Sequence, residues 1–408
     1  MKLKKITSIM LIVALTLSIV GCTFNESTST ETVSASNTTQ TVGESSDTNS
    51  DLTSELPSTE GTVLDTSYMF TDRDIEQTPD LSDAKTLELA SDTEYLIEEE
   101  GIYLISGDVE NTMIKVEAAD EAKVQLVLDS VSIVNEDKPA IYVKSGDKIY
   151  VTTTGSDNYL EVNDECENDG DINLDAVIFS KSDLVLNGTG TLEVISASEN
   201  GITSKDDLKV TGGTIVIDAS ADGLEANDSI RIYDGNITVV SGKDAIHSEN
   251  DDDTSLGYIY MENGTLNLTA DDDAIRGTSV VQIDGGTINI ETCTEGIEGT
   301  YVQINGGDIT IYATDDGINA AEKSDYDVVI EIYGGDIDIT MASGDTDAID
   351  SNGDIYVYGG TINIEASSAF DINGGSAVAQ LIGGDVTVNG ETITDLSSIS
   401  SGKGPKNK

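Results

Sequence analysis

The chain has 408 residues, with 77 Asp and Glu against 20 Lys and Arg, which gives a formal net charge of −57. The acids are spread along the repeats rather than confined to a tail, so phosphate-rich partners are repelled, and we expect no contact with nucleic acid or anionic membrane surfaces. Helical periodicity is absent and Pro is scarce, so a helical repeat protein is not indicated.

The N-terminus has the pattern of a secretion signal. Lysines among the first five residues precede an apolar run over residues 6–20, which is too short for a stable membrane span. The run ends in Ile19-Val20-Gly21-Cys22, which resembles a bacterial lipobox, where small residues precede the cysteine that becomes lipid-modified. We therefore predict a lipoprotein signal peptide at 1–21 and a lipid anchor on Cys22. This places the protein on the extracellular face of a bacterial cell envelope.

Two segments are poor in large apolar residues. Residues 22–80 are rich in Ser, Thr, Glu and Asn and cannot repay the entropy of ordering, so we predict a disordered tether there and a similar tail at 397–408. Residues 81–396 are predicted to form one domain, because a continuous repeat array explains nearly all of this sequence.

From Leu192 to Val388 one pattern recurs, with a glycine pair, alternating Ile or Val, and an acidic residue just before Gly-Ile or Ala-Ile. Its apolar anchors recur roughly every 22 residues, the length of one coil of a parallel β-helix. The anchors are Ile202, Leu224, Ile246, Ile275, Ile297, Ile318, Ile349 and Ile372. Two residues before them stand Asn200, Asp222, Asp244, Asp273, Glu295, Asp316, Asp347 and Phe370. Six consecutive coils thus carry a carboxylate at one position.

Each coil is predicted to contain three short strands. In residues 212–217 the alternation points Ile215 and Ile217 inward, Leu224 fills a short second strand, and Ile230 and Ile232 fill a third. Loops at 163–175, 249–256 and 321–327 interrupt the repeat and are expected to emerge from the stack. The fold class is therefore all-β, a three-sheet parallel β-helix of about ten coils.

The aligned acids predict a cation site. Equivalent positions on neighbouring coils lie about 4.8 Å apart, where two carboxylates repel by about 3 kcal/mol at an effective dielectric of 20. Oxygen ligands without nearby Cys or His suit calcium, although Asp is also a common turn residue that caps backbone amides. The predicted metal ligands are Asp222, Glu225, Asp244, Asp271, Asp272, Asp273, Glu295, Glu298, Asp315, Asp316, Asp347 and Asp350.

Several short motifs point to a known family. The segments Ala140-Ile141-Tyr142-Val143-Lys144, 180–184 and 204–208, with the repeated Asp-Gly-Ile and Gly-Gly-Thr-Ile, resemble a family of clostridial surface proteins. That resemblance covers about residues 124–388. It implies a calcium-binding, right-handed β-helix that binds cellulose and acidic pectic sugars, and kinship with the pectate lyases of polysaccharide lyase family nine.

The residues favour binding over catalysis. A lyase needs a Lys or Arg base beside its calcium, and Lys243 or Arg276 could serve, but basic residues beside acids are more often ion-paired. His247 is the single histidine, and no nucleophile motif lies near it. Trp is absent, so tyrosines must supply the aromatic faces for sugar, and the predicted carbohydrate-binding residues are Tyr233, Tyr333, Tyr356 and Tyr358. These tyrosines could equally pack across coils.

We therefore expect a monomeric surface lipoprotein that binds polysaccharide through a calcium-loaded β-helix without cleaving it. A pectate or polysaccharide lyase is the first alternative. A structural adhesin or spacer, in which calcium only stiffens the rod, is the second.

Overall fold

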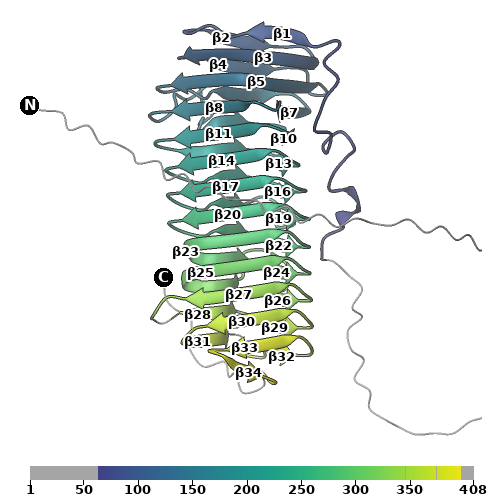
Figure 1. Cartoon of the computed structure of the whole chain (residues 1–408), viewed down its shortest axis with the longest axis vertical. Coiled ribbons are helices and arrows are strands. Elements are labelled where there is room, and N and C mark those ends of the chain that lie inside the picture. Colours follow the sequence, from purple (N-terminus) through teal and green to yellow (C-terminus); the bar gives the residue numbers. More distant parts are fainter. Residues whose placement is uncertain (1–62, 345, 374, 397–408) are drawn as a thin grey trace, which may run out of the picture. The chain divides into compact units, whose positions relative to one another are not determined.

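The computed structural model describes residues 63–344, 346–373 and 375–396, which form a parallel β-solenoid of about 12 turns. Figure 1 shows the strands stacked one above another along the axis of this solenoid. The predicted β-helix is therefore confirmed. Cys22 and the predicted signal peptide lie outside the described residues. Among the residues described, no helix is long and apolar enough to cross a membrane.

The strands stack into three parallel sheets. Strands β3 and β5 bend through a corner and pair in both the first and the second sheet, and β23 and β25 do the same between the second and the third. The first sheet contains β1 (Lys85–Glu88), β3 (Gly101–Glu110), β5 (Lys123–Asn135), β7 (Lys148–Thr153), β10 (Asp183–Gly188), β13 (Asp207–Val210), β16 (Ser229–Ile232), β19 (Tyr258–Met261), β22 (Val280–Ile283), β24 (Tyr301–Ile304), β26 (Val329–Ile332), β29 (Asp354–Val357) and β32 (Ala379–Leu381).

The other two sheets complete each coil. The second sheet adds β8 (Asp157–Val162), β11 (Thr191–Ser196), β14 (Thr214–Ala219), β17 (Asn236–Ser241), β20 (Thr265–Ala270), β23 (Thr287–Gly299), β25 (Asp308–Ala320), β27 (Asp336–Met341), β30 (Thr361–Glu365), β33 (Asp385–Val388) and the antiparallel β34 (Glu391–Ile393). The third sheet adds β2 (Glu94–Ile97), β4 (Met113–Glu117), β6 (Ile141–Ser145), β9 (Ala176–Ser180), β12 (Asn200–Ser204), β15 (Leu224–Ala226), β18 (Ile246–Ser248), β21 (Ile275–Gly277), β28 (Asp347–Ser351) and β31 (Ser368–Ile372).

The coil follows the predicted alternation of residues. Ile215 and Ile217 lie buried in β14, Leu224 in β15, and Ile230 and Ile232 in β16. Because successive side chains of a strand point to opposite faces, these residues stack with their equivalents into one continuous core along the solenoid. The 249–256 and 321–327 insertions fall between strands, as predicted.

The strand register confirms the predicted anchors except the last. Ile318 pairs with Ile349, but Ile349 pairs with Phe370 rather than with Ile372. The prediction of Ile372 as an anchor is therefore wrong: Phe370 takes that place, and Ser368 stands in the acidic column opposite Asp347. Both Phe370 and Ile372 are buried, so their hydrophobicity alone does not separate the two registers.

Residues 63–77, which we call the strap, lie across the outer face of the first sheet. They include the 3₁₀ helix η1 (Thr66–Tyr68), and their buried Leu64 and Met69 pack on Tyr258 and Tyr260 of β19. Figure 1 shows the strap along the side of the stacked strands. The predicted disordered tether reached residue 80, whereas the structure describes its last residues as packed on the solenoid.

Candidate functional site

The acidic column has a structural role at the corner that leads into the third sheet. In four successive column residues the side-chain Oδ1 accepts a hydrogen bond from the backbone N–H of the next column residue. These bonds are Asn200 from Asp222 at 2.9 Å, Asp222 from Asp244 at 3.0 Å, Asp244 from Asp273 at 2.9 Å, and Asp273 from Glu295 at 3.3 Å. All of these residues are buried. A buried amide without a partner costs about 1–3 kcal/mol, so Asn or Asp is needed there whether or not metal binds.

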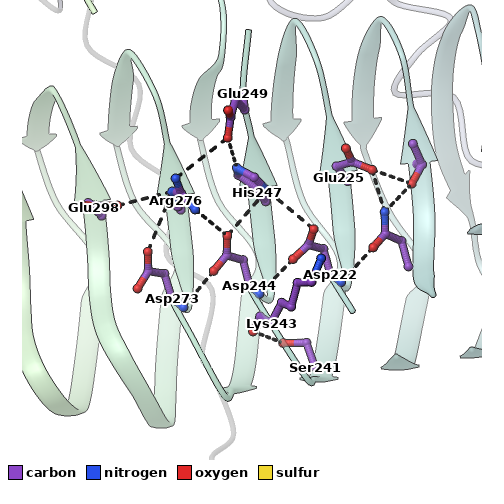
Figure 2. A network of polar contacts seen from close by, with 12 residues as sticks. Asp222, Glu225, Ser241, Lys243, Asp244, His247, Glu249, Asp273, Arg276 and Glu298 are labelled. Carbon is purple, nitrogen blue, oxygen red and sulfur yellow. Dashed lines mark hydrogen bonds and ion pairs between the residues drawn. The ribbon is translucent and has the colours of Figure 1, made fainter. Parts of the chain in front are cut away.

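A second column runs beside the first, three residues further along each coil. The strand register aligns Glu225 with His247, His247 with Arg276, Arg276 with Glu298, Glu298 with Asn319, and Asn319 with Asp350. Figure 2 shows His247 and Arg276 between the carboxylates of the first column. The predicted metal ligands therefore face side-chain cations as well as one another.

The first part of this double column is satisfied by protein partners. Glu225 accepts hydrogen bonds from Asn200 Nδ2 at 2.7 Å, Thr203 Oγ1 at 2.9 Å and Lys205 Nζ at 3.2 Å. His247 Nδ1 lies 3.5 Å from Asp244 Oδ2 (Figure 2). Since these oxygens already have donors, the structure gives little reason to place a cation on Glu225.

His247 is held in its charged form. Its Nδ1 also lies 3.7 Å from Asp222 Oδ2, and its Nε2 lies 3.0 Å from Glu249 Oε2. Burial alone would lower the pKa of His247, but the contacts with Asp222, Glu249 and Asp244 outweigh burial and raise the pKa to about 9. The imidazolium therefore neutralises part of the column at neutral pH.

Arg276, one of the two predicted bases, is surrounded by acids. Its guanidinium lies 3.3 Å from Asp244, 3.5 Å from Glu298, and 3.9 Å from each of Asp273 and Glu249. Burial opposes its charge, yet these carboxylates raise the pKa of Arg276 above its ordinary value. A general base must be deprotonated before it can accept a proton from the substrate. Arg276 stays protonated, so it is poorly suited to this role.

Lys243, the other predicted base, lies beside Asp222 at the edge of the column (Figure 2). Its side chain is exposed, and no carboxylate of the described residues lies within ion-pair distance of its ammonium.

Negative charge accumulates beyond Arg276. Asp273, Glu295 and Glu298 have carboxylate oxygens within 4.8 Å of one another, as do Glu295, Asp315 and Asp316. Burial, followed by the charge of Glu298, raises the pKa of Asp273 and of Glu295 well above the ordinary carboxyl range. Glu298 pairs with the ammonium of Lys323 as well as with the guanidinium of Arg276.

Asn319 borders this cluster. Its Nδ2 donates to Glu295 Oε2 at 3.0 Å and to Glu298 Oε1 at 3.2 Å. Its Oδ1 is buried and accepts no hydrogen bond within the described part of the chain. An orphaned buried carbonyl oxygen next to carboxylates has the chemistry of a calcium ligand. Asn319 is not among the metal ligands predicted from sequence, because only acidic residues were considered as ligands.

The remaining predicted metal ligands are dispersed. Asp272 is exposed but has an oxygen near Asp244 and Asp273, and Asp347 continues the first column in register with Asp316. Asp350 accepts a hydrogen bond from Asn373 at 3.3 Å in the second column. Asp271 is exposed and belongs to none of the close carboxylate groups in the described residues.

The predicted tyrosines divide into two places on the first sheet. Tyr333 and Tyr358 stack with ring centroids 4.5 Å apart, and Tyr356 lies 6.0 Å from Tyr358. Tyr233 is separate from them and packs edge-on against Phe70 of the strap at 5.2 Å. The predicted set is therefore brought together except for Tyr233.

A groove of about 500 Å³ lies beside the three tyrosines. Tyr301 and Tyr356 line it together with Glu331, Asp327 and Asp354. Glu331 accepts hydrogen bonds from the hydroxyls of Tyr301 at 2.6 Å and Tyr333 at 3.1 Å. Neither Tyr301 nor Glu331 was predicted as a binding residue. The sequence does contain a pattern that could have identified Glu331. This residue lies between buried Ile330 and Ile332, so its side chain points outward, and it is in register with Tyr356 on the next coil.

Comparisons with known proteins agree with the sequence motifs. Residues 91–346 and 294–404 match a family model described as carbohydrate-binding domain-containing protein. A protein of the same description from Acetivibrio thermocellus is 36% identical over 126 residues, which are 30% of this chain and 44% of that protein, so the match spans less than half of that relative.

A solved structure described as a polysaccharide lyase-like protein from C. thermocellum aligns with a TM-score of 0.49 and 28% identity, over 64% of this chain and 97% of that chain. The two segments matched by the family model together span most of the chain and nearly all of the solenoid. The chain therefore belongs to the family of carbohydrate-binding domain-containing proteins.

Proposed function

We propose that this protein binds polysaccharide at the groove beside Tyr301 and Tyr356 and does not cleave it. The observation that supports this proposal best is the composition of the groove. The rings of Tyr301 and Tyr356 line it, and the exposed carboxylate of Asp327 supplies acceptors for sugar hydroxyls. Glu331 and Asp354 add the lone pairs that their bonds within the protein leave unused. Its volume of about 500 Å³ lies in the range of small-ligand sites.

The groove favours a neutral sugar over a uronate. Its lining contains no Lys, Arg or His among the described residues. A uronate carboxylate would meet Glu331, Asp327 and Asp354 with no cation to offset the repulsion, whereas hydroxyls of a cellulose-type glucan donate hydrogen bonds to them. We therefore assign neutral glycan to this groove.

Affinity electrophoresis in gels that contain a soluble cellulose derivative tests the assignment. Loss of an aromatic contact worth about 1 kcal/mol weakens binding about fivefold, so Tyr356→Ala should migrate faster than the wild type in these gels. Tyr312→Ala is the matched control, because Tyr312 is 40% exposed on the second sheet, away from the groove. Equal retardation of Tyr356→Ala and the wild type would refute this site.

Calcium is the second part of the proposal. We place it at the carboxylates beyond Arg276, with ligands drawn from Asp273, Glu295, Glu298, Asp315 and Asp316. Their oxygens, with the unused Oδ1 of Asn319, form the hard donor set that calcium prefers. A bound ion would also offer a ligand position to an acidic sugar, so pectic glycans would bind here only with calcium.

A polysaccharide lyase is the alternative, and Lys243 is the residue that favours it. This lysine is exposed beside the acidic column, while Arg276 is held charged by its acids. Absorbance of unsaturated products on polygalacturonate, lost in Lys243→Ala, would establish the lyase. Absence of such products from the calcium-loaded protein would support binding without catalysis.

The proposed location of the protein in the cell follows from the lipobox-like motif that ends at Cys22. We propose that Cys22 carries a lipid that holds the protein on the outer face of the cell envelope. Cys22→Ser should release the protein into the medium, as measured by fractionation of the expressing bacteria.

A further inference from the structure

The first sheet carries a group of basic residues beneath the strap. Only 20 of the 408 residues are Lys or Arg, yet Lys209 and Arg231 stand in register on neighbouring coils of this face, with Lys148 close by on β7. Lys209 is 4% exposed, because the strap covers it. In a chain of net charge −57, a buried lysine beside a half-buried one on the same outer face needs an explanation.

The strap inserts one carboxylate into this basic group. Asp74 is fully buried, with Oδ1 3.4 Å from Lys148 Nζ and Oδ2 3.2 Å from Lys209 Nζ. The hydroxyl of Tyr150 donates to Asp74 Oδ1 at 3.2 Å, and the backbone N–H of Thr71 donates to Oδ2 at 3.0 Å. Both oxygens are therefore held by a pocket that the solenoid builds from Lys148, Lys209 and Tyr150.

The pocket depends on the anion for its stability. Burial and the nearby charges of Lys148 and Arg231 lower the pKa of Lys209, even with Asp74 present. Lys148 has a second acid, Asp183, at 3.5 Å, and Arg231 pairs with Asp207 at 2.8 Å. Within the described residues, Asp74 is the one carboxylate in ion-pair distance of Lys209. Removal of Asp74 would leave a buried cation without a counter-charge.

The segment that supplies Asp74 lies outside the strands of the solenoid. Its regular structure is limited to the three residues of η1, and it is held by side-chain contacts. Gln77 Nε2 donates to Thr211 O at 3.0 Å, Gln77 Oε1 accepts from Gly188 N at 2.8 Å, and Phe70 packs on Tyr233 and Tyr260. The strap can thus leave while the sheets keep all their backbone ladders.

We propose that Lys148, Lys209 and Tyr150 form a carboxylate-binding site for an acidic glycan, and that Asp74 of the strap occupies this site as an internal substitute for a uronate. Two lysines and a phenol match a single carboxylate, and aromatic Tyr260 lies further along the same face for the sugar ring. The site differs from the proposed calcium cluster, because it recognises the uronate directly by cations. This proposal depends on the proposed function in one respect, which is that the carboxylate bound by the lysines belongs to a polysaccharide.

Release of the strap tests this proposal in the full chain. The triple variant Leu64→Ala, Met69→Ala, Asp74→Ala removes the two buried apolar side chains of the strap and its buried carboxylate. Calorimetric titration with oligogalacturonate, in a chelator that removes the calcium route, should show at least about tenfold tighter binding than the wild type. Adding Lys209→Gln to the triple variant should abolish the gain. Asp72→Ala is the matched control, since it removes the same charge from an exposed residue of the strap.

Hydrogen exchange of residues 63–77 shows whether the strap has left. Lost protection without a gain in oligogalacturonate binding would overturn the proposal. Retained protection in the triple variant would also overturn it, because Asp74 and its neighbours would then not be what holds the strap. Misfolding cannot imitate a gain in affinity that depends on Lys209. Failure of the Tyr356→Ala test on neutral glycan would leave this result unaffected, so the two proposals fail separately.

Discussion

At the scale of single residues, one carboxylate of the acidic column does two tasks. Oδ1 of Asp222 accepts the backbone N–H of Asp244, and Oδ2 faces His247. The aspartate therefore both closes a corner of the solenoid and balances a cation. The sequence left two explanations of this column open, a metal site and turns in which Asp caps backbone amides. Hydrogen bonds to backbone amides and the His247 imidazolium account for part of the column.

His247 makes the stability of the solenoid depend on pH. Its pKa rises from an ordinary value of about 6.5 to about 9 on folding. The groups that face it are Asp222, Asp244, Glu249 and the like-charged Arg276. A raised pKa contributes stability that is fully present below pH 6.5 and is lost as the pH rises through 9. The wild type should therefore lose on the order of 2–3 kcal/mol across that interval.

His247→Gln removes the titrating group. Denaturant unfolding at pH 6 and pH 9 should show a smaller difference for this variant than for the wild type. The same pH difference in both proteins would contradict the role given to His247.

For strands and loops, sequence periodicity was sufficient to predict the strands but not to predict contacts between segments that are distant in the sequence. Alternating Ile and Val defined β14 to β16, because burial on one face demands that period. Phe370 and Ile372 are both apolar with the same alternation, so only the pairing with Ile349 separates them. The strap was missed because its contacts, such as Asp74 with Lys209, join residues 135 positions apart. The available signal was its group of large apolar residues, which includes Leu64, Met69 and Phe70.

The glycine after a column acid lies against the next coil. A Cβ on Gly317 would lie 2.5 Å from Ala348 O and 2.7 Å from Ile339 Cγ2, which no side-chain rotation relieves on the backbone side. Gly317→Ala should therefore cost about 1–3 kcal/mol of unfolding free energy, measured with denaturant. Gly155→Ala is the matched control, since its Cβ would meet no atom within 4 Å. A neutral Gly317→Ala would show that the coils are free to move apart.

At the scale of the whole molecule, the charge of −57 must be tolerated by a rod that stacks its acids. Self-repulsion on this scale opposes the compact state. The protein's own cations offset it over the first part of the column, through Lys205, His247 and Arg276. Beyond Arg276 the carboxylate oxygens of Asp273, Glu295 and Glu298 lie within 4.8 Å of one another, as do those of Glu295, Asp315 and Asp316. An added cation would offset the most repulsion at this end of the solenoid.

Chelation should therefore destabilise the protein, and the loss should map to that end. An ion present at 100 times its dissociation constant adds about 2.7 kcal/mol to the folded state. Melting should thus occur at a lower temperature in chelator and recover with calcium but not with sodium. Asp316→Asn should reduce this calcium-dependent shift, because it removes one ligand charge.

Asp338→Asn is the matched control, since Asp338 is an exposed acid on the second sheet. If chelator leaves the wild-type melting temperature unchanged and elemental analysis finds no calcium, the raised pKa values of Asp273 and Glu295 would instead mean that these carboxyls hold protons at neutral pH.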